Sequence, residues 1–201
     1  MKAAKKTAPS RTLGRPRSES SRVALLKAAY GFVKARPVGS ISTVEIARKA
    51  GVSTATIYRW WPNKEALLLD AFLYKTDSAP LLKAKGSPLG SLREYVLQVG
   101  RSFTGESGIV AARLLAAIQD NATLRKEFLE RVYSPRDKEF RAMVRAAIRQ
   151  RQLPASVNVN VFLETIFGPL LLRLLLRQEP IDRDYVLTVF KQVVAAYRRA
   201  Q

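Results

Sequence analysis

The chain of 201 residues contains 35 Lys and Arg against 16 Asp and Glu, which gives a formal net charge of +19, and 47% of its residues are hydrophobic. This length and apolar content suit one or two domains around a buried core, and the charge favours a polyanionic partner such as nucleic acid or an anionic membrane surface. Because Cys and His are absent, the composition excludes disulfides, thiolate nucleophiles, imidazole bases and zinc sites built from these residues.

The N-terminus carries most of the excess positive charge, since the first 63 residues hold 13 Lys or Arg and 2 acidic residues. Residues 1–18 combine Lys, Arg, Pro, Gly and Ser without periodicity, a composition that predicts a flexible basic arm. No apolar run follows its lysines, so we expect no signal peptide. The most apolar stretch, residues 166–176, is interrupted by Gly168, Pro169 and Arg173. We therefore expect no membrane span and a cytoplasmic location.

The first two predicted helices follow the arm. Apolar residues repeat at helical spacing from Glu19 onward, and Pro37 ends this pattern. Ser42 and Glu45 then form the S-x-x-E pattern of a capping box, which predicts a second helix over residues 43–50.

A tight turn and two further helix starts come next. Gly51 stands where a helix ends in a left-handed conformation, and Ser53 can cap a third helix over residues 54–60. Asn63 is placed to cap a fourth helix with a long apolar face. Later apolar periodicity predicts helices at about residues 88–103, 107–119, 123–151, 159–177 and 183–199. No strand-like alternation competes with these patterns, so the fold is predicted to be all-α.

The segment STVEIARKAGVSTATIYRWWPNKEALL joins two of these helices through a turn that contains Gly, which is the order of a helix-turn-helix. Thr54, Ala55 and Thr56 begin the second helix and are small enough to let its backbone enter a major groove about 12 Å wide. Larger side chains that could reach phosphates or bases follow at Tyr58, Arg59 and Lys64. The alternative is a tightly turned helix pair whose apolar residues are ordinary core of a helical bundle.

This N-terminal third resembles the TetR family of repressors. The resemblance runs, in order, through Thr43, Ala47, Gly51, Val52, Ser53, Thr56, Ile57, Tyr58, Pro62, Asn63, Lys64 and Glu65. It implies phosphate contacts at Thr43, Tyr58 and Lys64. It implies groove-facing positions at Thr54, Ala55, Thr56 and Arg59. Phosphate contacts position such a module on DNA, and base contacts specify the site.

Two other DNA contacts leave alternatives open. Trp60 stands where the family commonly has His, and it could offer DNA an indole donor and a broad apolar face or pack against the following helix. Arg15 and Arg17 lie in a segment that resembles the Gly-Arg-Pro arm of the family and could enter a narrow minor groove. A solvated tail is the alternative for this arm.

The C-terminal helices suggest a symmetric dimer. Residues 168–182, GPLLLRLLLRQEPID, resemble the eighth-helix segment of one TetR subgroup, and this resemblance implies the fold and dimerisation. Apolar side chains repeat at helical spacing on the last two helices, which suits a four-helix interface or, alternatively, the core of one subunit. These side chains are Leu170, Leu171, Leu174, Leu175, Val186, Val189, Phe190, Val193, Val194 and Tyr197.

Residues 67–177 are expected to enclose a mostly apolar effector cavity, because the resemblance implies such a site and the inward helix faces of a bundle would line it. The candidate lining residues, each of which could instead be ordinary core, are Phe72, Phe103, Leu114, Ile118, Phe128, Phe162 and Phe167. The apolar stripes hold few acids and no His, so we expect a neutral or anionic hydrophobic effector. Its carboxylate, if it has one, could pair with Arg101, Arg113 or Arg173.

The remaining carboxylates, such as Glu106, Asp120 and Glu164, are scattered and lack a partner base or phosphate loop, so we predict neither an enzyme nor a cofactor. The predicted architecture is a three-helix helix-turn-helix domain over residues 19–66 followed by a larger ligand-binding and dimerisation domain over residues 67–201. We expect a homodimeric regulator, most simply a repressor, that binds a palindromic double-stranded DNA operator and is released by a small hydrophobic effector. The alternatives are a non-specific basic protein that binds nucleic acid or anionic membrane surfaces, and a helix-turn-helix protein that has lost its DNA function.

Overall fold

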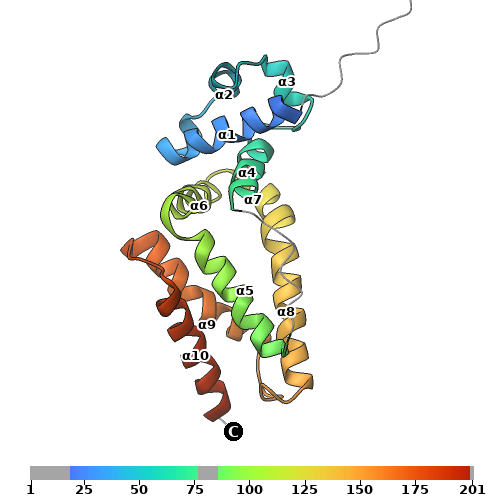
Figure 1. Ribbon diagram of the computed structural model, residues 1–201, viewed down its shortest axis with the longest axis vertical. Coiled ribbons are helices and arrows are strands. Elements are labelled where there is room, and N and C mark those ends of the chain that lie inside the picture. The colour runs from blue at the N-terminus through green and yellow to red at the C-terminus, as the bar shows by residue number, and fades with distance from the viewer. Residues whose placement is uncertain (1–18, 77–85, 200–201) are drawn as a thin grey trace, which may run out of the picture.

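The structure, a computed structural model, describes residues 19–76 and 86–199. Over these two ranges it contains helices and no strand, so the all-α prediction is confirmed. The helices α1, α2 and α3 gather at one end of an elongated molecule, and α5, α8, α9 and α10 extend to the other end (Figure 1). The bounds are α1 Glu19–Ala35, η1 Val38–Ser40, α2 Thr43–Lys49, α3 Thr54–Tyr58, α4 Lys64–Lys75, α5 Pro88–Ser102, α6 Gly105–Ala117, α7 Ala122–Phe128, η2 Leu129–Tyr133, α8 Ser134–Arg149, α9 Val159–Leu172, η3 Arg173–Arg177 and α10 Arg183–Arg199.

Side-chain caps set the helix starts of the N-terminal module. The Ser42 hydroxyl accepts a hydrogen bond from the Glu45 N–H at 3.3 Å, and the Ser42 N–H donates to the Glu45 carboxylate at 3.1 Å, which confirms the predicted capping box. Asn63 Oδ1 accepts from the Ala66 N–H at 2.7 Å and caps α4. Gly51 has a φ of +68°, the left-handed geometry that ends α2 and turns the chain into α3.

Two apolar cores hold the chain together. The first combines α1–α4 with α6 and α7, and its buried side chains include Leu25, Ile46, Ile57, Leu68 and Leu114. The second combines α5, α8, α9 and α10, and its buried side chains include Leu92, Phe140, Phe162, Ile166 and Phe190. Phe103 and Leu174 pack against both cores. Helices α6 and α7 complete the core of the N-terminal helices. The domain boundary that we predicted at residue 66 therefore crosses an apolar core to which both predicted domains contribute.

The predicted long helix over residues 123–151 forms as one helical run from α7 through η2 to α8. Its middle, Leu129–Tyr133, has the wider π-helical geometry, which occurs mostly as single turns inside α-helices and often at functional sites. The run therefore contains a local irregularity that the apolar periodicity did not predict.

The helix formed by α9 and η3, Val159–Arg177, corrects one expectation. Its 19 residues are long and apolar enough, by length and composition alone, to cross a membrane. Only 17% of its most apolar stretch is buried inside the molecule. The expectation that no stretch is apolar enough was wrong, because Pro169 does not end the helix and apolar residues extend it back to Val159. A helix that leaves so much apolar surface uncovered is suited to a partner.

The last helix, α10, uses its apolar stripe within the subunit. Val186, Val189, Phe190 and Val193 are buried in the second core, where α10 packs against α5 and α9. Most of the apolar stripe predicted on this helix therefore packs within the subunit. On α9 and η3, in contrast, an exposed apolar stripe remains at Val161, Leu172, Leu175 and Leu176.

Candidate DNA interface and effector cavity

The recognition helix α3 is anchored by one buried side chain and presents the rest to solvent. Ile57 is fully buried in the first core. Thr54 and Thr56 are half-buried, whereas Ala55, Tyr58 and Arg59 are exposed, Tyr58 to 56%. At the helix start, the hydroxyls of Ser53 and Thr56 lie 3.1 Å apart, and Ser53 makes no capping hydrogen bond. The side chains at the start of this helix are thus small, and the exposed side chains at its end are larger and include a basic residue, as the sequence predicted.

The three residues predicted to contact phosphates lie around the start of α2. The Thr43 and Tyr58 hydroxyls are 3.4 Å apart, and Lys64 Nζ donates to the Ile41 carbonyl at 3.0 Å. Lys64 therefore joins α4 to the residue just before the cap of α2. An ammonium group has three donors, so this contact leaves others available, but it also gives Lys64 a structural role that the sequence did not reveal.

Glu45 stabilises the same region electrostatically. Its carboxylate pairs with Arg36 at 2.7 Å across the gap from α1 to α2. The Arg36 hydrogen bond, together with those from Ser42, lowers the pKa of Glu45 from the usual 4.5 to about 2. The carboxylate thus remains ionised well below neutral pH and holds the start of α2 against α1.

The two tryptophans after α3 differ in their environments. Trp61 is buried, and its Nε1 donates to Asp70 of α4 at 2.7 Å. Trp60 is half-buried, with the Arg22 guanidinium 5.7 Å from its ring centroid. Packing thus explains Trp61, whereas Trp60 keeps enough exposed surface for either of its two predicted roles. Arg15 and Arg17, the predicted minor-groove contacts, lie outside the described residues.

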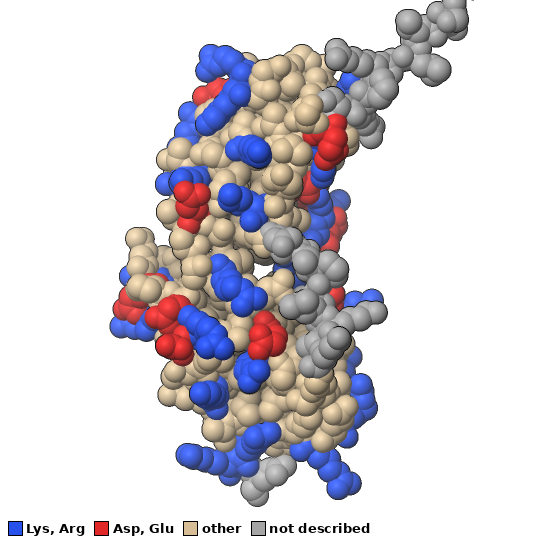
Figure 2. All heavy atoms as spheres, viewed as in Figure 1, with Lys and Arg blue, Asp and Glu red and all other residues tan. Residues whose placement is uncertain are grey.

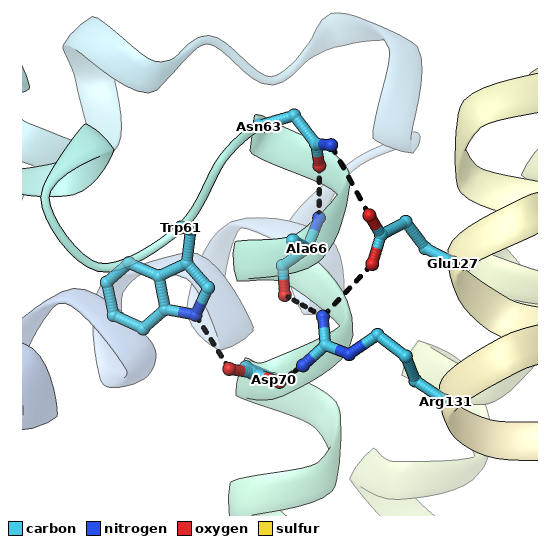
Figure 3. Close-up of polar contacts among 6 residues, drawn as sticks. All are labelled: Trp61, Asn63, Ala66, Asp70, Glu127 and Arg131. Atoms are coloured by element: carbon cyan, nitrogen blue, oxygen red, sulfur yellow. Dashed lines mark hydrogen bonds and ion pairs between the residues drawn. The ribbon is translucent and has the colours of Figure 1, made fainter.

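A polar network joins this module to the rest of the chain, and Figure 3 shows its six members. Arg131 of η2 forms ion pairs with Asp70 of α4 and, at 3.2 Å, with Glu127 of α7. The Asn63 amide donates to Glu127 at 3.4 Å, and Asp70 accepts from Trp61 through its other oxygen. A single carboxylate, that of Asp70, therefore links the guanidinium of Arg131 to the indole of Trp61, which lies three residues beyond the end of α3.

A cavity of about 830 Å³ lies between α4, α5, α6, η2, α8 and α9. This volume is in the usual range for small-molecule sites. Six of the seven predicted residues line it: Phe72, Phe103, Leu114, Ile118, Phe128 and Phe167. The prediction for Phe162 was wrong, because this ring is fully buried in the second core, 5.3 Å from the Tyr197 ring and 6.4 Å from the Phe140 ring. Apolar periodicity cannot separate a cavity wall from a filled core.

The three arginines that we expected to pair with a carboxylate of the effector lie outside the cavity wall. Arg113 donates to the Val33 carbonyl of α1 at 2.8 Å. Arg173 pairs with Glu179 at 3.2 Å and stacks on the Tyr185 ring. Neither these two nor Arg101 is among the residues that line the cavity. The suggested pairing of any of the three with an effector in this cavity is therefore wrong.

The polar residues of the cavity wall that the sequence interpretation missed include Tyr95, Gln98, Arg131 and Arg136. A signal for Arg136 was available, because it stands four residues from both Val132 and Phe140 and so interrupts the apolar face of a helix. The Tyr95 hydroxyl donates to the Arg136 carbonyl at 3.0 Å. Burial raises the pKa of Tyr95 and lowers that of Arg136.

Positive charge is not confined to the helix-turn-helix. Lys and Arg side chains are scattered over the end that carries α1–α3 and again over the opposite end (Figure 2). Net charge alone therefore does not locate the DNA interface, and the local arrangement of α2 and α3 must do so.

Comparison with known families agrees with this arrangement. The family described as "Bacterial regulatory proteins, tetR family" matches residues 25–71. The family described as "Tetracyclin repressor-like, C-terminal domain" matches residues 82–193, more than half of the chain. The two matches together cover the helix-turn-helix and nearly all of the helices that surround the cavity.

Individual relatives extend the likeness over most of the chain. The HTH-type transcriptional regulator YdeS of Bacillus subtilis (strain 168) is 32% identical over 187 residues, covering 90% of this chain and 94% of YdeS. The fold is shared with Bacillus subtilis FadR in complex with stearoyl-CoA, at 18% identity and a TM-score of 0.71, covering 86% of this chain and 97% of that one. It is also shared with the flavonoid-responsive regulator FrrA, at 21% identity and a TM-score of 0.66, covering 91% and 97%. The chain therefore belongs to the TetR family of transcription regulators and carries its helix-turn-helix DNA-binding domain.

Proposed function

We propose that the protein is a cytoplasmic, homodimeric repressor that binds a palindromic operator and is released by a small hydrophobic effector. In this proposal, residues 1–18 form a basic arm, residues 19–66 bind DNA, and residues 67–201 bind the effector and dimerise. The observation that carries the proposal is the position of Arg131, which lines the cavity and forms an ion pair with Asp70 of α4, the carboxylate that also accepts from Trp61. A polar network thus connects the cavity wall with the residues proposed to bind DNA.

The DNA-binding part of the proposal assigns roles to the exposed surface around α3. Thr54, Ala55, Thr56 and Arg59 would face the major groove, with Trp60 beside them. Thr43, Tyr58 and Lys64 would contact phosphates, and Arg15 and Arg17 would follow the minor groove. The grouping of the Thr43 and Tyr58 hydroxyls supports a shared phosphate site.

The dimer part of the proposal depends on α9 and η3. Their exposed stripe of Val161, Leu172, Leu175 and Leu176 includes a leucine that is 75% exposed. Exposed apolar surface of this kind marks an interaction site, and a two-fold interface uses the same surface on both subunits. A dimer built in this way would place two recognition helices about one DNA turn apart, roughly 34 Å.

The effector part of the proposal is supported by the cavity and by the polar network that connects its wall to Trp61. FadR binds stearoyl-CoA and FrrA responds to flavonoids, and both share this fold. Movement of η2 on effector binding would act on Asp70 through Arg131, and on Trp61 through Asp70. Because linkage is reciprocal, an effector that weakens DNA binding must itself bind more weakly to the DNA complex.

Selection of bound DNA from a random pool, followed by footprinting of the best site, tests the proposal. We expect an inverted repeat protected with two-fold symmetry, and binding that is much weaker on a shuffled version of the same sequence. A footprint without two-fold symmetry would contradict the dimeric arrangement. Equal affinity for selected DNA, random DNA and anionic vesicles would instead favour the non-specific basic protein.

A further inference from the structure

The charges in the cavity wall are nearly all balanced or in solvent. The charged side chains that line the cavity are Arg131, Arg136, Asp137, Glu139 and Glu164. Arg131 is neutralised by Asp70 and Glu127, as Figure 3 shows. Asp137 is neutralised by Arg141 at 2.6 Å. Glu139 and Glu164 are exposed, so water weakens their charges without cancelling them.

Arg136 is the exception in this wall. Its Nη1 donates to the Val132 carbonyl at 3.0 Å within the same helical run, and it forms no ion pair within 4.0 Å with a carboxylate in the described parts of the chain. The side chain is half-buried, and burial lowers its pKa. A guanidinium nevertheless remains protonated in proteins. The cavity therefore contains a permanent positive charge without an anionic partner.

The surroundings of Arg136 hold it in one place. The Tyr95 hydroxyl of α5 binds its backbone carbonyl, and Val132 and Phe140, one turn away on either side, are buried. A charge in apolar surroundings is costly unless it is paired and hydrogen-bonded. Hydrogen bonds from arginine to a carboxylate are charge-assisted and frequently bidentate. A bound anion would thus complete the site.

The rest of the wall limits the ligand further. Phe72, Phe103, Phe128 and Phe167 supply large apolar surfaces, which suit a hydrophobic body rather than a small inorganic ion. Glu139, one turn from Arg136, is the acid that acts on this guanidinium electrostatically. It would disfavour a second negative charge on the ligand.

We propose that Arg136 anchors the head group of a singly charged anionic amphiphile whose hydrophobic body occupies the cavity. This inference rests on the proposed effector site and names the chemical class of its ligand. A carboxylate matches the planar fork of a guanidinium in geometry and carries a single charge.

The test uses three probes with the same twelve-carbon chain: dodecanoate, dodecanol and dodecylamine. Each is titrated calorimetrically, below its aggregation concentration, into the full-length protein and into the R136M and R136K variants. R101M serves as the matched control, because Arg101 is exposed and does not line the cavity. Thermal melting checks that each variant is folded.

We expect the wild-type protein to bind dodecanoate most tightly and dodecylamine most weakly. R136M should lose at least about tenfold in dodecanoate affinity, the effect of a lost charge-assisted hydrogen bond, and should bind dodecanol within about twofold of the wild type. R136K should retain part of the preference, and R101M all of it. The same dodecanoate affinity in R136M and wild type, a preference for dodecylamine, or no binding of any probe would overturn the inference.

Binding of the ligand through Arg136 and release of the operator are tested by separate measurements. The titrations are done without DNA, and so they measure the anchor alone. If dodecanoate binds through Arg136 but leaves operator affinity unchanged, the anchor stands and release by this ligand class is refuted.

Discussion

The helix-turn-helix and the cavity region differ in how their structures are encoded. In the first, boundaries follow from adjacent residues: Ser42 caps α2, Gly51 ends it, and Asn63 caps α4. In the cavity region, helix positions also follow local periodicity, but the lining of the cavity depends on which helix faces are brought together in the folded chain. Phe162 and Phe167 lie five residues apart on α9, yet only Phe167 borders the cavity. Local signals thus specify the DNA-binding module, whereas tertiary packing specifies the effector site.

The largest effect is expected where the helix-turn-helix depends on one buried side chain. Ile57→Ala should lower the free energy of unfolding by about 2–5 kcal/mol, because Ile57 is the fully buried anchor of α3. Val44→Ala is the control, since Val44 is 63% exposed on α2 and should change stability by less than about 0.5 kcal/mol. Chemical denaturation measures both. Similar small effects of the two substitutions would mean that α3 is not held by the core.

The next effect separates specificity from affinity on the DNA-binding surface. Arg59→Ala should reduce discrimination between the operator and a mismatched site by about 1–3 kcal/mol, because base contacts carry the sequence information. Lys64→Ala should weaken binding to all DNA and reduce the salt slope by about one. Binding titrations at several salt concentrations distinguish the two. An unchanged salt slope would limit Lys64 to its structural contact with Ile41.

The sequence predicted the fold well for a physical reason. Helix periodicity and caps are properties of neighbouring residues, so the bounds of α2, α9 with η3, and α10 were nearly those observed. The cavity candidates were chosen by size and apolarity, which located six lining residues but wrongly included Phe162. The polar wall was missed for a different reason. Arg131 is neutralised in part by Asp70, which lies 61 positions away in the sequence, so helical periodicity alone could not separate it from Arg136, which is unpaired within the described chain.

The network between the two regions should give a smaller effect. The Asp70→Asn and Arg131→Met double-mutant cycle should yield a coupling of about 1 kcal/mol, a modest value because both side chains are partly exposed, to 22% and 34%. The Arg93–Glu94 pair, which is more exposed and does not line the cavity, is the control and should couple by less than about 0.5 kcal/mol.

The same network variants address regulation. If the route from the cavity to the DNA runs through Arg131, an effector that releases the wild-type protein from its operator should release Arg131→Met less completely. Because Arg131 also lines the cavity, effector binding to each protein is first measured without DNA, and release is then compared at equal effector occupancy. Full release of the variant would exclude this ion pair as the link between the two regions.

The smallest effect concerns acid stability of the helix-turn-helix. Folding lowers the pKa of Glu45 from 4.5 to about 2 through its hydrogen bonds with Arg36 and Ser42. The folded state thus releases this proton more readily than the unfolded state, so the stabilisation is complete above about pH 4.5 and is lost as the pH falls towards 2. Melting temperatures of wild type and Glu45→Gln should therefore converge over this interval.

Because Arg36 supplies the largest contribution, Arg36→Met should remove most of the same pH-dependent difference, and substituting Glu45 in that background should then add little. The effect is small because the carboxylate is accessible to water, which screens the ion pair. A constant difference between wild type and Glu45→Gln from pH 6 to pH 2 would show that Glu45 acts through packing or hydrogen-bond geometry and not through its charge.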